Sequence, residues 1–255
     1  MTVIVEIKAA DRNVLVPLFK DCQYDRVLID SVLEGNFGSA YADSVSQPTV
    51  TRLDSGAFTM LGGNPVVARA RDLLHYAPID YVTPQDNEWR NLLQREFGTR
   101  ISVLPFTDFS AESLDLAQLA ELTWAVPPTF ELEQIDKPLA EQIPFDIGNE
   151  YFFENFQSVD DFLGRGIGFC ILHQDKIVSA ATSMAQSSKA IDIEIEIVPA
   201  FRRQGLGTVV GAKLVSYCLE QKIEPRWLAA NVVSERLALK LGYVRGETYE
   251  TYEIQ

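Results

Sequence analysis

The sequence predicts a protein of the α/β (α+β) class with two parts, and three observations support this prediction. Segments that alternate apolar and polar residues, as strands do, are interleaved with segments of helical period. A chain of 255 residues with 47% hydrophobic residues is long enough for two modest domains, each with a buried core. The prolines Pro127 and Pro128 interrupt this pattern near the middle of the chain.

The N-terminal part is predicted to contain helices on either side of a strand hairpin. Residue period and turn residues predict helices over 10–35, 66–76, 88–97 and 112–124, and strands over 39–43, 49–53, 57–61, 79–82 and 100–106. The run Gly-Gly-Asn-Pro at 62–65 closes this hairpin region.

The proline pair is expected to mark the domain boundary, because neither proline can donate to a ladder or continue a helix. We therefore predict an N-terminal αβ domain over residues 1–126 and a C-terminal domain over 127–255. The C-terminal domain is predicted to begin with strands over 130–135, 168–173 and 177–184 and a helix near 159–163. Both parts run from helix to strand, turn and strand, so an internal duplication is one hypothesis.

Composition limits the classes of function. A net charge of −14 repels polyanions, which argues against nucleic-acid binding and favours the approach of cationic substrates such as amines. No apolar run is long enough to cross a membrane, and the first residues do not resemble a signal peptide. Cys22, Cys170 and Cys218 are far apart, and neither His75 nor His173 has a second ligand at short spacing. We predict a cytoplasmic protein without metal, nucleic-acid or membrane partner; the oligomeric state is not predicted.

One segment of the C-terminal part combines a strand, a basic glycine turn and a helix. Residues 191–198 alternate isoleucine with mostly acidic residues, and Pro199 ends this strand. The turn at 202–208 (Arg-Arg-Gln-Gly-Leu-Gly-Thr) then leads into an amphipathic helix. The first N–H groups of a helix have no intrahelical partner and lie at the positive end of its dipole. The turn is therefore a candidate phosphate site, where Gly205 and Gly207 are expected to let a phosphate approach the backbone.

Two motifs in this part resemble the GNAT N-acetyltransferase superfamily. The pattern R-x-x-G-x-G from Arg202 to Gly207 resembles the family's pyrophosphate loop, whereas a Walker A loop needs a lysine and a dinucleotide fingerprint a third glycine. Further on, Asn231 is placed as a helix N-cap and Gly242 as the glycine that ends the helix, in a Leu-Gly-Tyr run. This run resembles the family element that lines the pantetheine arm.

The wider pattern, including the run Tyr-Phe-Phe-Glu-Asn-Phe at 151–156, resembles the two-part GNAT proteins that include zwittermicin A resistance-type acetyltransferases. The resemblance implies a mixed, mostly antiparallel central sheet flanked by helices in the C-terminal domain. It makes the N-terminal αβ domain a candidate for the same fold.

The resemblance also implies acetyl-CoA as the acyl donor substrate and assigns roles to residues. Carboxylates on the polar face of the central strand are candidates for the base that deprotonates the amine, with Glu194 first and Glu196 second. Against this stands the possibility that these acids only solvate an exposed strand face. The cofactor-binding candidates form three groups. The N–H groups of Ile197 and Val198 would meet the thioester oxygen, and Asn231 and Ser234 would lie beside the pantetheine or adenylate. The residues expected around the pyrophosphate are Arg202, Arg203, Gln204, Gly205, Leu206, Gly207 and Thr208.

One position departs from the family pattern. Many GNAT enzymes carry a tyrosine seven positions after the motif asparagine, proposed as the acid for the departing thiolate, and this chain has Ala238 there. Either solvent serves as the acid, or Tyr217, Tyr243 or Tyr249 takes that role.

Three functions stay open from the sequence. The first is transfer of an acetyl group from acetyl-CoA to a primary amine on a small molecule, with the N-terminal part shaping the acceptor cleft. The second is acetylation of proteins. The third is a non-catalytic CoA-binding regulatory module, which Ala238 favours and the carboxylates of the strand oppose.

Overall fold

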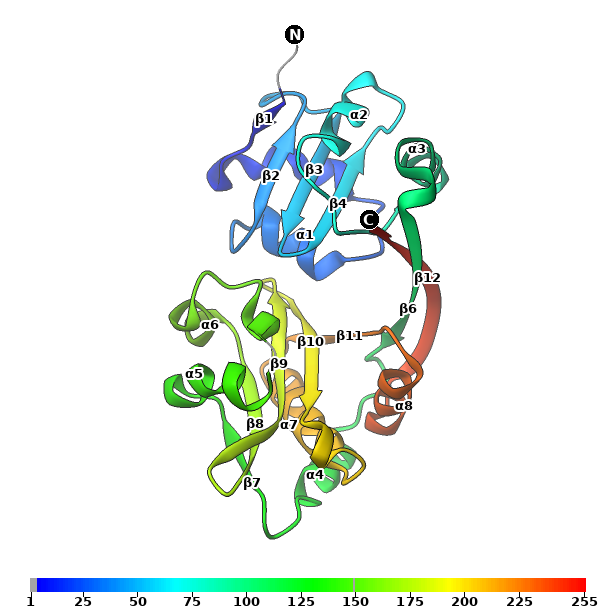
Figure 1. Ribbon diagram of the computed structural model, residues 1–255. Coiled ribbons are helices and arrows are strands. Elements are labelled where there is room, and N and C mark those ends of the chain that lie inside the picture. Colours follow the sequence, from blue (N-terminus) through cyan, green and yellow to red (C-terminus); the bar gives the residue numbers. More distant parts are fainter. Residues whose placement is uncertain (1–3, 149) are drawn as a thin grey trace. The chain divides into compact units, whose positions relative to one another are not determined.

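The computed structural model describes residues 4–148 and 150–255, and the chain divides into two compact units (Figure 1). Unit 1 comprises the residues up to Phe106 together with Tyr249–Gln255, and unit 2 comprises Thr107–Thr248. The chain passes from one unit to the other within two strands, β6 (Ile101–Ser110) and β12 (Val244–Ile254).

This division differs from the boundary that the prolines indicate. Pro127 and Pro128 lie in the loop between α4 (Leu116–Trp124) and β7 (Glu131–Gln134), and both elements belong to unit 2. Leu119 of α4 is buried in the same cluster as Val215 and Leu241 of unit 2. The prolines therefore end a helix without separating two cores.

Unit 1 contains a sheet with the strand order β1-β2-β3-β4-β5-β12. All of these neighbours are antiparallel except the parallel pair β4–β5. Its elements before β6 are β1 (Val5–Glu6), the 3-10 helix η1 (Ala9–Phe19), α1 (Arg26–Leu33), β2 (Ser39–Ala42), β3 (Val50–Ser55), β4 (Phe58–Gly63), α2 (Ala68–Leu74), β5 (Tyr81–Val82), α3 (Asn87–Phe97) and the 3-10 turn η2 (Gly98–Arg100).

The predicted strands and helices of this part are confirmed apart from the first helix. A single helix over 10–35 is wrong, because η1 and α1 are separated by a turn at 20–25. Pro17 lies inside η1, where it removes one backbone donor, and Asp25 adopts a left-handed conformation with φ of +53°. These two residues explain why the helical period does not produce a continuous helix.

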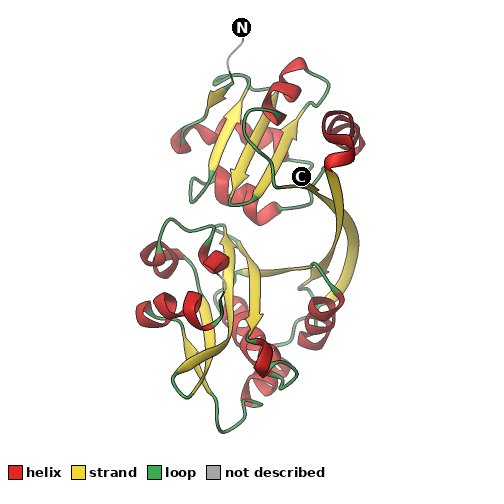
Figure 2. Ribbon diagram, viewed as in Figure 1, coloured by secondary structure: helices red, strands yellow, loops and turns green. Residues whose placement is uncertain are grey.

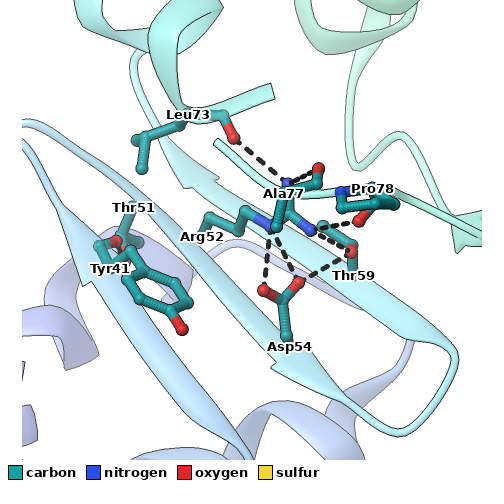
Figure 3. Close-up of polar contacts among 8 residues, drawn as sticks. All are labelled: Tyr41, Thr51, Arg52, Asp54, Thr59, Leu73, Ala77 and Pro78. Atoms are coloured by element: carbon teal, nitrogen blue, oxygen red, sulfur yellow. Dashed lines mark hydrogen bonds and ion pairs between the residues drawn. The ribbon is translucent and has the colours of Figure 1, made fainter. Parts of the chain in front are cut away.

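A buried arginine joins the sheet of unit 1 to the segment between α2 and β5 (Figure 3). Arg52 on β3 is 1% exposed, and its Nε lies 2.8 Å from Oδ1 of Asp54. Its two terminal nitrogens donate to the carbonyl oxygens of Leu73, Ala77 and Pro78 at 3.2, 2.8 and 2.6 Å. The guanidinium thus binds carbonyl groups at the C-terminal end of α2 and in the segment that follows it.

Unit 2 contains a sheet with the strand order β7-β8-β9-β10-β11-β6, in which β10–β11 is the parallel pair (Figures 1 and 2). After α4 and β7, its elements are α5 (Lys137–Asp146), the 3-10 helix η3 (Glu150–Phe153), α6 (Val159–Arg165), β8 (Gly168–His173), β9 (Lys176–Gln186), β10 (Ala190–Ile197), the 3-10 turn η4 (Pro199–Phe201), α7 (Leu206–Glu220), β11 (Glu224–Ala229) and α8 (Val232–Leu241).

Helices cover both faces of this sheet, as alternation along β8 demonstrates. Phe169 and Ile171 pack in a cluster with residues of α7, whereas Cys170 packs with Phe152 and Phe162 of η3 and α6. Successive residues of a strand point to opposite faces, so α7 lies on one face and α5, η3 and α6 on the other. The predicted mixed, mostly antiparallel sheet flanked by helices is confirmed.

The two units repeat one topology. In chain order, β1 to β6 with their helices correspond to β7 to β12, and each unit has its single parallel pair between its fourth and fifth strands. The sixth strand of each sheet comes from the other half of the sequence. In unit 1 β12 pairs with β5, and in unit 2 β6 pairs with β11. Each unit is therefore completed by the last strand of the other half of the sequence, and the repeat supports the duplication hypothesis.

Candidate active site

The candidate site begins where β10 and β11 separate. The parallel ladder joins Ala190–Asp192 to the first residues of β11, Glu224 to Arg226. Among the described residues no register pair between these strands occurs beyond Asp192, whereas the antiparallel ladder with β9 continues to Ile197 and Ser179. The second half of β10 is therefore hydrogen-bonded to a neighbour on one side only.

The ladder geometry determines which backbone groups of β10 face the open side. The N–H group of Val198 donates to the carbonyl oxygen of Val178 on β9 at 2.9 Å, so Val198 is bonded to its ladder partner. Hydrogen-bonded and non-hydrogen-bonded pairs alternate along an antiparallel ladder. The N–H groups of Ile195 and Ile197 therefore point away from β9, to the side that β11 has left. Of the two N–H groups expected to meet the thioester, that of Ile197 faces this side.

Glu194 lies on the face of β10 opposite to α7. Its neighbours Ile195 and Ile197 face α7, because a Cβ on Gly211 or Gly207 would meet their Cδ1 atoms at 3.0 and 2.7 Å. Glu194 is half-buried, and burial, followed by the charge of Glu196, raises the pKa of its carboxyl group from 4.5 to about 7. A carboxyl group with that pKa exchanges protons near neutral pH, as a general base must.

Glu196 lies on the same face as Glu194, but its carboxylate has a local partner. The N–H group of Ile197 donates to Oε2 of Glu196 at 3.3 Å. This contact occupies the same N–H group that faces the open side of β10. Glu196 therefore competes with any ligand carbonyl for Ile197.

The turn before α7 has an unusual backbone and an open exterior. Arg203 has φ of +64° and Gly205 has φ of +84°, and Gly205 is the N-cap residue of α7. The N–H groups of Thr208 and Val209 bond to the carbonyl oxygen of Gly205, which leaves the N–H groups of Leu206 and Gly207 without intrahelical acceptors.

The side of Gly205 is open, because a Cβ there would meet no atom within 4 Å. Arg202, Arg203 and Gln204 are exposed, and Nε of Arg202 donates to the carbonyl oxygen of Ile197 at 3.2 Å. The turn thus presents backbone donors and two cations at the end of β10, an arrangement that suits a pyrophosphate.

Gly207 has a different role from the one expected. It is buried, and the Cβ position lies 2.7 Å from Cδ1 of Ile197, so its lack of a side chain lets α7 lie close to β10. Leu206 and Thr208 are also buried, with exposures of 1% and 7%. Contact with a phosphate through their N–H groups stays a prediction.

Asn231 and Ser234 stand at the start of α8. Oδ1 of Asn231 accepts hydrogen bonds from the N–H groups of Val233 and Ser234, both at 3.0 Å, so the predicted N-cap is confirmed. Oγ of Ser234 accepts a hydrogen bond from the indole of Trp227 at 3.1 Å. Both side chains have structural partners, and their contact with a cofactor stays a prediction.

The structure argues against Tyr243 as the acid for the leaving thiolate. Ala238 is fully buried beside Trp227 and Tyr243. The hydroxyl group of Tyr243 donates to the carbonyl oxygen of Pro225 at 2.9 Å, and burial raises the pKa of this phenol well above 10.0. Tyr217 lies eleven residues along α7 from Leu206, about 16 Å from the turn. A role for Tyr249 stays a prediction.

Within the described part of the chain, no group of three or more His, Cys, Asp or Glu side chains is arranged to hold a metal ion. No helix among the same residues has the length and apolar character that a membrane span needs.

Comparisons with known proteins agree on one family. Residues 16–252 match the family model described as GNAT acetyltransferase. The uncharacterized N-acetyltransferase YdfB of Bacillus subtilis (strain 168) is 23% identical over 264 residues, which cover 99% of each chain. A GCN5-related N-acetyltransferase-like protein from Streptococcus suis 89/1591 superposes with a TM-score of 0.85 at 29% identity, covering 97% of this chain and 99% of that one. A tandem GNAT protein from the clavulanic acid biosynthesis pathway shares the fold, with a TM-score of 0.61, 14% identity and coverage of 98% and 97%.

Proposed function

Because the chain belongs to the GNAT acetyltransferase family, we propose that unit 2 transfers the acetyl group of acetyl-CoA to a primary amine of a small molecule. The observation that carries this proposal is Glu194, a half-buried carboxyl group with a pKa of about 7 on the strand that leads into the Gly205 turn.

The donor is assigned to the turn and to the open side of β10. The N–H groups of Leu206 and Gly207, the cations of Arg202 and Arg203 and the empty space beside Gly205 suit the pyrophosphate. The N–H group of Ile197 would bind the thioester oxygen, after the carboxylate of Glu196 has left it.

Transfer of the acetyl group then requires the acceptor amine in its neutral form. An alkylammonium group has a pKa near 10, so it must lose a proton before its nitrogen attacks the thioester carbon. Glu194 accepts that proton, directly or through water. The new C–N bond forms as the C–S bond breaks, and the acylated nitrogen gives up its second proton to solvent. Solvent also protonates the thiolate, whose intrinsic pKa near 8.5 makes it a competent leaving group.

An acceptor with positive charge fits the protein's net charge of −14, because a negatively charged protein favours the approach of cations. Protein acetylation and CoA binding without catalysis are the two alternatives. The contribution of residues 1–126 to an acceptor cleft stays a prediction.

The experiment is thiol release from acetyl-CoA with a panel of amines, peptides and proteins. We expect Glu194→Gln to lower kcat about 10²- to 10⁴-fold with little change in acetyl-CoA affinity, and Glu196→Gln to have a smaller effect. Glu220→Gln, which removes an exposed carboxylate at the far end of α7, is the matched control and should retain activity.

In the wild type, kcat/KM should rise with pH through about 7, because Glu194 must be ionised to accept a proton. Thermal stabilisation by acetyl-CoA without turnover on any acceptor would favour the binding module. Turnover on proteins but on no small amine would favour the second alternative.

A further inference from the structure

Three buried hydroxyl groups lie close together on β9, and one of them differs from the other two. Oγ of Ser179 donates to the carbonyl oxygen of Glu196 at 3.1 Å. Oγ of Ser183 accepts from the N–H group of Ile167 at 3.0 Å and lies 3.3 Å from its carbonyl oxygen. Oγ1 of Thr182, which is 0% exposed, has no hydrogen-bond partner among the described residues. A buried hydroxyl group without a partner costs free energy, so this one needs an explanation.

Thr182 is the direct cross-strand partner of Glu194. Paired residues of an antiparallel ladder project to the same face, with Cβ atoms about 4.5–5.5 Å apart, a distance that a glutamate side chain spans. The methyl group of Thr182 points toward β8, because a Cβ on Gly168 would lie 2.9 Å from Cγ2. The hydroxyl group occupies another branch of Cβ and is free to donate to a carboxylate on β10.

The charged side chain that acts on Glu194 does not stabilise its ionised form. Glu196 is the charged neighbour that affects Glu194, and it repels the ionised carboxylate. The single charged residue of β9 is Lys176, at the first position of the strand and six residues from Thr182. On this face of the sheet, η3 and α6 contribute the aromatic side chains of Phe152 and Phe162 to the core cluster.

We propose that Thr182 is a positioning residue for Glu194: its hydroxyl group donates a hydrogen bond to the ionised carboxylate and holds it in the conformation that accepts the amine proton. This inference rests on the proposed function, in which Glu194 is the base. The proton that Glu194 gains passes on to solvent, and the hydroxyl group of Thr182 keeps its own proton throughout. Protonation of Glu194 weakens the bond, so Thr182 favours the ionised form.

The test is a titration of the Glu194 carboxyl group by 13C NMR in the free protein, with the resonance assigned by its absence in Glu194→Gln. Thr182→Val keeps the branched shape and removes the hydroxyl group, and we expect the titration midpoint to rise by about 1 pH unit. Thr182→Ser restores a hydroxyl group and should return the midpoint close to the wild-type value. Ser179→Ala, which removes a neighbouring hydroxyl group bonded to the backbone, should leave the midpoint unchanged.

Kinetics provide the second readout. In Thr182→Val, kcat/KM should fall about tenfold on the acidic limb, where a one-unit rise in pKa lowers the ionised fraction of the base tenfold, and should approach the wild-type value above pH 9. The inference is overturned if the titration midpoint of Glu194 in Thr182→Val equals that of the wild type. It is also overturned if Thr182→Ser does not return the midpoint to the wild-type value. The titration needs no turnover, so a shifted midpoint in a protein that transfers no acetyl group would refute the proposed function and leave the hydrogen bond standing.

Discussion

Units 1 and 2 share one strand topology and differ in the residues placed at its fourth strand. The fourth strand of unit 1, β4, reads Phe-Thr-Met-Leu-Gly-Gly and has no carboxylate, whereas β10 carries Glu194 and Glu196. The helix after this strand is 7 residues long in unit 1 and 15 in unit 2. The turn before α2 contains no arginine, whereas the turn before α7 contains Arg202 and Arg203. One topology therefore carries the candidate chemistry in one unit only, because function depends on local residues.

The polar groups of the two units are also used differently. In unit 1, Arg52 satisfies an aspartate and three carbonyl groups and is itself buried. In unit 2, Glu194 is partly desolvated and Thr182 lacks a partner among the described residues. Local departures from a well-satisfied structure are expected at functional sites.

Replacing Arg52 tests the structural side of this comparison and should have the largest effect. Arg52→Met leaves Asp54 and the carbonyl groups of Leu73, Ala77 and Pro78 without their buried donor, and we expect a loss of about 3–5 kcal/mol in the free energy of unfolding. Urea denaturation measures it. The control is Arg69→Met in α2, whose ion pair with Asp72 has side chains 29% and 50% exposed and should contribute roughly 1 kcal/mol at most. Equal losses in the two variants would contradict the contrast.

Replacing Gly205 tests the functional side. Gly205→Val should weaken acetyl-CoA binding at least about 100-fold, which corresponds to about 2.8 kcal/mol, because the side chain fills the space assigned to the pyrophosphate. Isothermal titration calorimetry measures the affinity.

Gly98 supplies the matched control in unit 1. It also has a positive φ, +50°, and open space around its Cβ position, so Gly98→Val carries a similar backbone strain. Its acetyl-CoA affinity should equal that of the wild type. Unchanged affinity in Gly205→Val would remove the pyrophosphate from this turn.

Replacing Glu194 is expected to cause the smallest change, which is a change in the free energy of unfolding. Its folded-state pKa of about 7 lies above the ordinary value of 4.5, so the folded protein binds more protons than the unfolded chain between these pH values. Wild-type stability should therefore fall as pH rises through this window. Glu194→Gln lacks this loss and should be more stable by on the order of 1–3 kcal/mol at pH 8, with little difference at pH 4.

Urea denaturation at both pH values checks this prediction, with Glu220→Gln as the control for removal of an exposed carboxylate. A gain in Glu194→Gln that is equal at pH 4 and pH 8 would count against a raised pKa.

Local signals predicted most of the fold. The strict alternation before Pro199 predicts β10, and Asn231 and Gly242 predict the ends of α8, which runs from Val232 to Leu241 as expected. The resemblance based on the Arg202–Gly207 pattern is confirmed by the family match. These features depend on neighbouring residues, and a sequence displays them directly.

Non-local features escaped prediction. The pairing of β6 with β11 and of β12 with β5 depends on contacts between distant segments. Local sequence therefore predicts a boundary at Pro127, whereas the units divide within β6 and β12. The pKa of Glu194 and the unpaired hydroxyl group of Thr182 depend on burial, which strand alternation alone does not quantify. The close packing of Gly207 against Ile197 also belongs to tertiary structure, so the sequence alone did not indicate it.

The reciprocal placement of β6 and β12 has a consequence for biosynthesis. A domain made of one continuous segment can fold while the ribosome is still translating the remainder of the chain. The sheet of unit 1 cannot be completed in this way, since its sixth strand is supplied by residues of β12, translated after nearly all of unit 2. The nascent N-terminal half therefore keeps an unpaired strand edge at β5 until β12 has been translated.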